Sequence, residues 1–360
     1  MSGLDAVDAL ALGGQPPRAD ALSVSAGATR DEWERLVSES PDSTFCHLYG
    51  WHMVMQDVLR HESIQLVARD ELGIVQGVLP LVRVRGVLGH YLISLPFMND
   101  GGPIGSAEAC ESLAAHALGM ARESGAGLLE LRSRCAVAGE LQTSFRKVAV
   151  HLALPETVEA LWATTFKAKL RSQIRRPTKD GMTAKVGADQ LGAFYRVFAR
   201  NMRDLGTPVL PRAFFETLQS TFGDRVMFTA VYAADGTTAA ASCCLQWRDE
   251  IEVTWASSLR EFNKLSPNML LYATMMEHAI GRGARVFNFG RSTPGAATHR
   301  FKQQWGGVDI PLPWAFWSRV ADAGTPSADG AGLRLAQTMW KRMPLFVANR
   351  LGPVLARQLP

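Results

Sequence analysis

Residues 283–289 read Gly283-Ala284-Arg285-Val286-Phe287-Asn288-Phe289, and residues 125–131 read Gly125-Ala126-Gly127-Leu128-Leu129-Glu130-Leu131. In both stretches a glycine closes an apolar helix and a short apolar strand follows. The two stretches lie 158 residues apart, and the glycines of two predicted hairpin turns, Gly73 and Gly236, lie 163 apart. Similar elements at a nearly constant offset predict a duplicated α/β unit.

The segments around these stretches follow one order in both halves. In the first half we expect helices within 30–59, strands at 64–69, 77–84 and 90–95, a helix at 107–124 and a strand at 128–131. In the second half we expect helices at 193–202 and 212–222, strands at 226–232, 238–247 and 250–257, a helix at 267–282 and a strand at 285–289. Each unit is therefore an antiparallel meander followed by a crossover helix and a parallel strand.

The composition narrows the class of protein. The chain has 360 residues, of which 47% are hydrophobic and 20% charged, and a mean hydropathy near zero. These values exclude a mostly disordered chain and a polytopic membrane protein. Five cysteines form no disulfide framework and favour a reducing compartment. We expect a cytoplasmic protein, which can also lie peripherally at the inner face of the membrane.

The charge is unevenly distributed. The net charge is +4, but residues 331–360 hold five basic residues and no acidic ones, which leaves −1 for the rest of the chain. This balance excludes a globally basic nucleic-acid binder. We expect a flexible leader at 1–29, and a linker with a cationic amphipathic segment at 321–360. That segment either packs on the body or lies on an anionic membrane surface.

Three stretches of the second half resemble a known family. They are Ser266-Pro267-Asn268-Met269-Leu270-Leu271-Tyr272, Phe287-Asn288-Phe289-Gly290-Arg291-Ser292-Thr293 and Phe301-Lys302-Gln303-Gln304-Trp305-Gly306-Gly307. The element order is similar to the N-acetyltransferase (GNAT) fold. Two such units in one chain resemble the FemAB acyltransferases, and more narrowly the FemAB-like proteins found with exosortase/PEP-CTERM exopolysaccharide systems.

The resemblance implies a fold and an activity. The fold is α/β (α+β), with two tandem GNAT-like domains at 30–150 and 151–320, each a mixed sheet flanked by helices. The activity is acetyl or aminoacyl transfer to an amine or hydroxyl of a cell-envelope, peptidoglycan or exopolysaccharide precursor, which can be lipid-linked. A different hypothesis is a non-catalytic GNAT-fold module that binds an anionic glycan or lipid head group.

Lys302 is the leading catalytic candidate. Phe301 and Trp305 are four residues apart and share a helix face, beside which Lys302 projects. In the FemAB resemblance the matching lysine lies at the acyl-carrier end, where a cation stabilises phosphate or a tetrahedral intermediate, and Trp305 contributes to substrate binding. Alternatively, Lys302 is a solvated surface lysine and the two aromatic residues anchor the core.

The loop after the last predicted strand of the second unit is a candidate binding site. Arg291 can hold a phosphate or carboxylate and Ser292 can hydrogen-bond the same group. Ser266 begins the preceding helix in the manner of an N-cap, so that Lys264, Ser266 and Asn268 are candidates for binding the acyl donor. The loop 260–265 lacks the glycine-rich arm of coenzyme A users, and the donor stays open between acyl-CoA and aminoacyl-tRNA.

A basic stretch and a pair of glutamates complete the candidates. Residues 166–179 hold six cations, of which Arg171 and Arg175 share a helix face and are candidates for acceptor binding, together with Asn201 and Arg203. A solvated basic helix is the alternative. Glu252 is the candidate general base, although with Glu250 it also fits a solvent-facing charge pair. The eight histidines show no metal-ligand spacing, and we expect no metal.

Overall fold

The computed structural model describes residues 22–86, 89–320 and 331–359. The first unit contains helices α1 (Arg30–Glu39), α2 (Trp51–Met53) with η2 (Val54–Val58), and α3 (Ala107–Glu123). Its strands are β2 (Glu62–Arg69), β3 (Val75–Gly86), β4 (Gly89–Ile93) and β6 (Leu128–Leu131). The second unit contains α6 (Leu191–Leu205), α7 (Arg212–Phe222), β10 (Val226–Tyr232), β11 (Thr238–Trp247), β12 (Glu250–Ser258), α8 (Pro267–Gly281) and β13 (Val286–Ser292).

The predicted duplication is confirmed. In both units three antiparallel strands lead through a helix into a strand that pairs in parallel, β4 with β6 and β12 with β13. Gly125 and Gly283, which close the crossover helices, both have positive φ, at 71° and 78°. This left-handed conformation favours glycine. The matched glycines therefore mark the same turn in both copies.

Strands that the sequence analysis did not predict join the two units. The sheets have the orders β1-β2-β3-β4-β6-β15-β7 and β14-β8-β13-β12-β11-β10-β9. β8 (Val148–Ala153) leaves the first unit and pairs with β13, whereas β15 (Trp314–Ser318) returns to pair with β6. The predicted boundary at 150/151 thus falls inside β8, and the last strand within 151–320 belongs to the first sheet. The other additional strands are β1 (Ser23–Ala26), β5 (Ile104–Gly105), β7 (Gln142–Ser144), β9 (Thr183–Val186) and β14 (Val308–Pro311).

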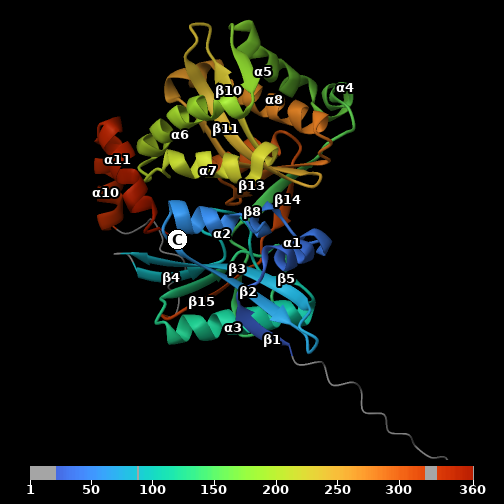
Figure 1. Cartoon of the computed structure of the whole chain (residues 1–360). Coiled ribbons are helices and arrows are strands. Elements are labelled where there is room, and N and C mark those ends of the chain that lie inside the picture. Colours follow the sequence, from blue (N-terminus) through green and yellow to red (C-terminus); the bar gives the residue numbers. More distant parts are fainter. Residues whose placement is uncertain (1–21, 87–88, 321–330, 360) are drawn as a thin grey trace, which may run out of the picture.

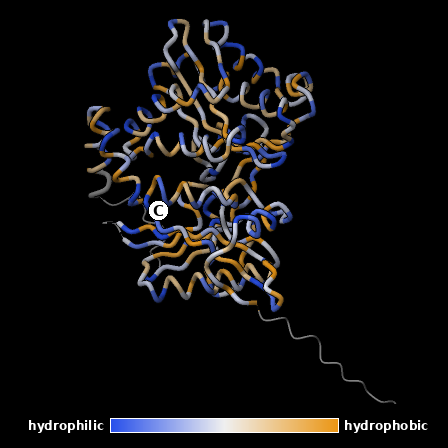
Figure 2. Tube along the Cα trace, viewed as in Figure 1, coloured by the Kyte–Doolittle hydropathy of each residue, from blue (hydrophilic) through white to orange (hydrophobic). Residues whose placement is uncertain are grey.

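The helices form three layers around the two sheets (Figure 1). α3 covers the outer face of the first sheet, and α8 with α5 (Ala168–Lys179) covers the outer face of the second. Between the sheets lie α1, α2, α6 and α7, whose aromatic side chains share one core; Phe45 packs on Phe222 and Trp51 on Phe214. Figure 2 shows the hydrophobic residues concentrated along the strands.

The predicted flexible leader at 1–29 is wrong in its last part, which contains a strand. Residues 1–21 of the predicted leader lie outside the described residues, but Ser23–Ala26 form β1 and pair with β2. The predicted linker at 321–330 also lies outside the described residues. The C-terminal segment forms α10 (Ala331–Arg342) and α11 (Leu345–Ala356), which pack on α6. Among the described residues, no helix has both the length and the apolar character needed to cross a bilayer.

Candidate active site

The site begins where two parallel strands separate. β12 and β13 pair from Glu250–Val286 to Glu252–Asn288, and beyond this point they diverge. The register of β13 against β8 shifts between Asn288 and Arg291, so that β13 bends at Gly290. The carboxyl ends of parallel strands are where α/β folds bind their ligands. The divergence opens a cleft between the end of β13 and the continuing edge of β12.

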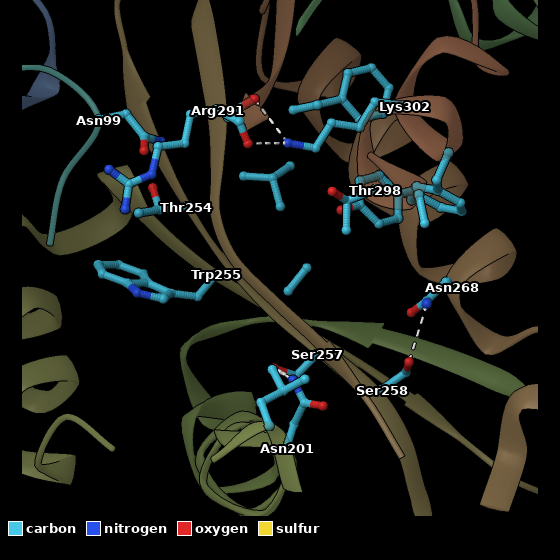
Figure 3. Close-up of a pocket in the computed structure, with 18 of the residues that line it drawn as sticks. Asn99, Asn201, Thr254, Trp255, Ser257, Ser258, Asn268, Arg291, Thr298 and Lys302 are labelled. Carbon is cyan, nitrogen blue, oxygen red and sulfur yellow. Dashed lines mark hydrogen bonds between the residues drawn. The ribbon is translucent and has the colours of Figure 1, made fainter. Parts of the chain in front are cut away.

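The cleft has a volume of about 680 Å³. Most of its walls come from the second unit, and the loop after β4 in the first unit contributes Phe97 and Asn99. Figure 3 shows its polar side chains pointing into one space from β12, β13, α6, α8 and α9 (Ala297–Gln303). These side chains are Asn99, Asn201, Thr254, Ser257, Ser258, Asn268, Arg291, Thr298 and Lys302.

Lys302 lies in the wall of this cleft with its ammonium held at the bend of β13. It is 8% exposed, and its Nζ donates to the carbonyl oxygens of Gly290 at 2.9 Å and Arg291 at 2.8 Å (Figure 3). An ammonium has three donors, so one remains for a group in the cleft. Burial lowers the pKa of Lys302 to about 8, against the attraction of Glu252. The expectation of a solvated surface lysine is therefore wrong.

Glu252 lies behind the wall of the cleft and borders a smaller cavity of about 130 Å³ together with Arg134 and Glu250. It is 5% exposed and accepts a 2.5 Å hydrogen bond from Asn99 Nδ2. Gly290, with φ at 71°, passes over this pair. A Cβ there would lie 2.9 Å from the Val253 oxygen, 3.3 Å from Asn99 Nδ2 and 4.0 Å from Glu252 Oε1. Only glycine therefore fits at position 290.

The environment of Glu252 favours the protonated form of its carboxyl group. Burial, with the nearby charges of Asp100 and Glu250, raises the pKa of Glu252 to about 7. A carboxyl with a pKa near neutrality is suited to accept a proton in a reaction. The expectation of a solvent-facing Glu250–Glu252 pair is wrong, because Glu250 is also engaged within the protein.

Arg134 joins the two units beneath the site. Its guanidinium pairs with both Glu250 oxygens, at 2.8 and 2.6 Å, and with Asp100 Oδ2 at 2.9 Å. Asp100 follows β4 and Arg134 follows β6 in the first unit, whereas Glu250 begins β12 in the second. Asn288 Nδ2 also donates to Glu250, at 2.9 Å. This network fixes β12, and with it Glu252, against the first unit.

Arg134→Met should destabilise the protein by about 2–3 kcal/mol. The change leaves the carboxylates of Asp100 and Glu250 without their cation. Breaking a fully buried pair costs about 3–5 kcal/mol, and the side chain of Arg134 is 25% exposed, which reduces the loss. Urea unfolding at pH 7 measures the difference, with Arg122→Met, which breaks an exposed pair with Glu140, as the matched control. Equal unfolding free energies for the two variants would contradict this role.

The corresponding opening in the first unit is closed. β4 and β6 pair up to Ile93–Glu130, and the chain continues to bridge them because Arg132 N donates to Ser94 Oγ at 2.7 Å. The Arg132 side chain lies where the second unit has its cleft, and it donates hydrogen bonds to Glu130 Oε1 and to the Met98 carbonyl oxygen, both at 2.8 Å. Of the two parallel-strand ends, the second alone opens into the cleft described above.

Arg291 is brought to the cleft, as expected. Its guanidinium is accessible from the cleft and stacks on the ring of Trp314 at 5.3 Å, while Arg132 stacks on the same ring at 5.0 Å. Although Arg291 is exposed to the cleft, partial exclusion of water by the surrounding protein and the charge of Arg132 lower the pKa of Arg291 to about 10. The guanidinium thus stays charged at neutral pH and can bind an anion in the cleft.

Asn201 and Asn268 also line the cleft, from α6 and from the start of α8. Asn201 Nδ2 donates to Ser257 Oγ at 3.1 Å, and Asn268 Nδ2 donates to Ser258 Oγ at 3.2 Å (Figure 3). Each amide keeps its oxygen as a possible acceptor toward the cleft. These two side chains stand on either side of the β12 edge.

Four predicted substrate-binding residues have structural contacts away from the cleft. Arg171 donates to the oxygens of Trp162 and Phe166, and Arg175 stacks on the Trp162 ring, because α5 packs on the outer face of α8. Arg203 pairs with Asp204 and donates to the Met343 oxygen, which fastens the C-terminal segment. Trp305 is 1% exposed within the aromatic core around Tyr272, as the alternative reading of this motif expected.

The remaining predicted residues lie at the margins. Ser292 is buried, and its hydroxyl has no hydrogen-bond partner among the described residues. Ser266 occupies the position before α8 with φ at 54°, and its side chain does not cap the helix. It lines a second cavity of about 360 Å³, which shares Asn268 and Phe301 with the main cleft. Lys264 is exposed in a short 3₁₀ helix, outside both cavities.

Several site residues were not predicted. Local sequence patterns do not indicate Asn99, Asp100 and Arg134, because these residues meet Glu250 and Glu252 only through tertiary contacts between the units. Thr254, Trp255, Ser257 and Ser258 follow Glu252 along β12. The repeat implies a pair of parallel strands here, and ligands bind at the carboxyl ends of such strands, which is the signal that could have identified these four residues.

His299 has a structural role beside the site. His299 Nδ1 accepts from the Gly295 amide, and Nε2 lies 2.8 Å from Asp309 Oδ1, so this histidine holds the loop before α9. No group of three or more histidine, cysteine, aspartate or glutamate side chains in the described ranges could hold a metal ion.

Comparisons with known proteins agree with this geometry. A family model described as an acetyltransferase (GNAT) domain matches residues 164–303, which include β12, α8, β13 and Lys302. No curated protein sequence matches the chain.

The crystal structure of FemX is similar at a TM-score of 0.60 and 14% identity, covering 82% of this chain and 97% of that one. A tandem GNAT protein from the clavulanic acid biosynthesis pathway is similar at a TM-score of 0.52 and 15% identity, covering 85% of this chain and 100% of that one. The C-terminal domain of a putative lysylphosphatidylglycerol synthetase from Agrobacterium fabrum is similar at a TM-score of 0.53 and 14% identity, covering 86% of this chain and 95% of that one.

At these identities the similar structures establish the fold. The predicted fold, two mixed sheets flanked by helices in tandem GNAT units, is confirmed. The matched residues include most of the cleft lining, the diverging strands and the buried lysine. Residues 164–303 thus match the model of an acetyltransferase (GNAT) domain, which supports an acyltransferase, and the fold of the chain is similar to those of FemX and of a tandem GNAT protein.

Proposed function

We propose that the protein transfers an acetyl or aminoacyl group to an amine or hydroxyl of a cell-envelope, peptidoglycan or exopolysaccharide precursor. The similarity to FemX and the sequence resemblance to FemAB-like proteins of exosortase/PEP-CTERM systems favour such an acceptor. The observation that carries the proposal is the Lys302 side chain, which lines the cleft where β12 and β13 separate and which has one N–H beyond the two that Gly290 and Arg291 accept.

Lys302 stabilises the charge that develops in the reaction. When the acceptor nitrogen or oxygen attacks the acyl carbonyl, a bond to carbon forms and the carbonyl oxygen becomes an oxyanion. The remaining N–H of Lys302 donates to that oxyanion. Collapse breaks the bond to the donor's sulfur or ribose oxygen, and this leaving atom takes up the proton that the nucleophile has released to Glu252. Gly290 and Arg291 hold the ammonium fixed throughout, because their carbonyls accept its other two hydrogens.

Glu252 receives the proton of the nucleophile. Its carboxylate lies under Gly290, and Thr254 Oγ1 lies 3.5 Å from Oε1 on the side of the cleft. Asn99, which bonds the same oxygen, also lines the cleft. A water or the Thr254 hydroxyl therefore provides a short path from the nucleophile to Glu252. The network of Arg134 keeps the negative charges of Asp100 and Glu250 neutralised while Glu252 changes its charge.

The start of α8 and the second cavity fit the phosphate-bearing part of a donor. No side chain caps the N-terminus of α8, and helix N-termini bind phosphate through free amides. Arg176 and Gln173 line the second cavity beside Ser266 and Asn268. Both donors carry phosphates: acyl-CoA has them at the far end of its pantetheine arm, and aminoacyl-tRNA has them along its nucleotide backbone. The opposite end of the cleft, with Asn201 and Trp255, is left for the acceptor.

A ligand screen tests the donor. We expect acetyl-CoA or an aminoacyl-tRNA at a hundred times its Kd to stabilise the full chain by about 2.7 kcal/mol, measured as a rise in Tm. The matched pair of variants is Arg176→Ala, which should weaken the effect, and Lys169→Ala, an exposed lysine of the same helix, which should not. Mass spectrometry of the products then identifies the transferred group. Absence of stabilisation and of transfer with every donor would overturn the proposed activity.

A further inference from the structure

The C-terminal helix pair, α10 and α11, has a body-facing side that is well packed. Trp340 is 8% exposed, and Ala348 and Ala356 are 1% exposed. A Cβ at Gly352 would lie 2.8 Å from Val209, and one at Gly206 would lie 3.0 Å from Lys341. The pair is therefore fixed on α6 and the loop after it, as one of the two readings of the sequence expected (Figure 1).

The other side of the pair is unusually apolar for a surface. Among the described residues, fourteen large hydrophobic side chains are exposed, and six of them lie between positions 335 and 355. These are Leu335, Met339, Phe346, Leu351, Val354 and Leu355. Phe346 is 76% exposed, and with Arg350 and Val354 it forms an i, i+4, i+8 stripe on α11. Concentrated apolar exposure of this kind marks an interaction surface.

The charge of the segment identifies its partner. Residues 331–360 contain five basic and no acidic residues, and Lys341, Arg342 and Arg350 are exposed. A symmetric dimer through this face would bring the same cations against each other, which is unfavourable. Apolar side chains flanked by cations instead match an anionic lipid surface, where the apolar groups enter the acyl boundary and the cations meet the head groups.

We infer that α10 and α11 are a docking surface for anionic lipid bilayers, which holds the cleft at the membrane. The surface and the cleft share α6. Leu205, half-exposed, lines the cleft, while Arg203 and Gly206 contact the helix pair. A lipid-linked acceptor would then present its head group beside the cleft; this last step rests on the proposed acyltransferase function, and the docking itself does not.

Vesicle co-sedimentation tests the docking. The full chain should bind vesicles of equal parts phosphatidylglycerol and phosphatidylcholine at least tenfold more tightly than vesicles of phosphatidylcholine alone. The double variant Phe346→Asp/Val354→Asp should lose at least tenfold in binding. Phe145→Asp, a change at a 62% exposed phenylalanine elsewhere on the protein, should bind as the unchanged chain does. Arg350→Gln should weaken binding about fivefold, the contribution of one surface cation.

Three results would overturn the inference: equal binding to both vesicle types, unchanged binding by the double variant with a normal circular dichroism spectrum, or a dimer in sedimentation equilibrium that the double variant abolishes. The last result would assign the face to a second copy of the chain. Acyl transfer to a water-soluble acceptor distinguishes the docking proposal from the proposed acyltransferase function. The double variant Phe346→Asp/Val354→Asp should retain this transfer, because the reaction does not need the membrane. Loss of transfer with intact vesicle binding would count against the acyltransferase function alone.

Discussion

Replacing Lys302 by methionine is expected to lower kcat about 100- to 1000-fold, the loss typical of removing one donor to an oxyanion. Methionine keeps most of the apolar stem of this α9 side chain, while the ammonium is lost. The free energy of binding of the donor should change little, since the phosphate-binding end lies at α8, across the cleft. Steady-state kinetics together with the Tm shift by the donor measure the two effects separately.

Two further variants make the Lys302 experiment decisive. Lys302→Arg retains a cation and should recover part of the rate, whereas Lys169→Ala should leave the rate unchanged, because Lys169 is an exposed lysine on α5. The side chain of Lys302 also binds two carbonyl oxygens, so unfolding in urea must accompany the kinetics. A variant that folds normally and transfers the acyl group at the usual rate would show that Lys302 has a structural role only.

Glu252→Gln is expected to produce opposite effects on rate and stability. As the proton acceptor, Glu252 accounts for a rate factor of about 10²–10⁴. The kcat/KM of the unchanged protein should rise with pH through about 7, as Glu252 ionises, and fall above about 8, as Lys302 loses its proton. In the glutamine variant the rise of kcat/KM at low pH should disappear. Because Glu252 and Lys302 interact, the two apparent pKa values of this pH profile belong to the pair and not to either residue alone.

The stability effect of Glu252→Gln depends on pH with a definite sign. The pKa of Glu252 is raised from 4.5 to about 7 on folding, so the folded state favours the protonated carboxyl. Below pH 4.5 the carboxyl is protonated in both states and the variant should match the unchanged protein. Above pH 7 the folded protein carries an unfavourable buried charge, which the glutamine removes. This difference amounts to at most about 3 kcal/mol.

Urea unfolding at pH 5 and pH 8 measures this difference. The glutamine variant should gain unfolding free energy at pH 8 and little at pH 5, and Glu277→Gln, on the far side of α8, serves as the control. Asn99 can donate to the glutamine oxygen as it does to Glu252, so the packing is preserved. A variant less stable than the unchanged protein at pH 8 would show that Glu252 is ionised and well solvated in the folded state.

Local sequence patterns determined most of the secondary structure. The strands Val226–Tyr232 and Thr238–Trp247 have the predicted bounds, because a hairpin with a turn at Asp235-Gly236 is specified by neighbouring residues. The repeat of helix, glycine and apolar strand determined the duplicated units and placed Arg291 after the end of a strand, whereas Lys302 was a candidate through the resemblance to the FemAB family. Spacing within a helix also located Phe301 and Trp305 on one face, although it could not tell a binding aromatic from a core aromatic.

Tertiary structure alone decided how the units combine and which candidates share the site. β8 and β15 are short strands whose partners lie far away in the chain, so no local periodicity assigns them to a sheet. The environment of Glu252 depends on Asn99, Asp100 and Arg134, more than a hundred residues earlier. Burial and the charges across an interface set a pKa, and both arise only when the first unit packs on the second. Arg171, Arg175 and Trp305 lie away from the cleft because of packing within the second unit, where their side chains contact the core and neighbouring helices.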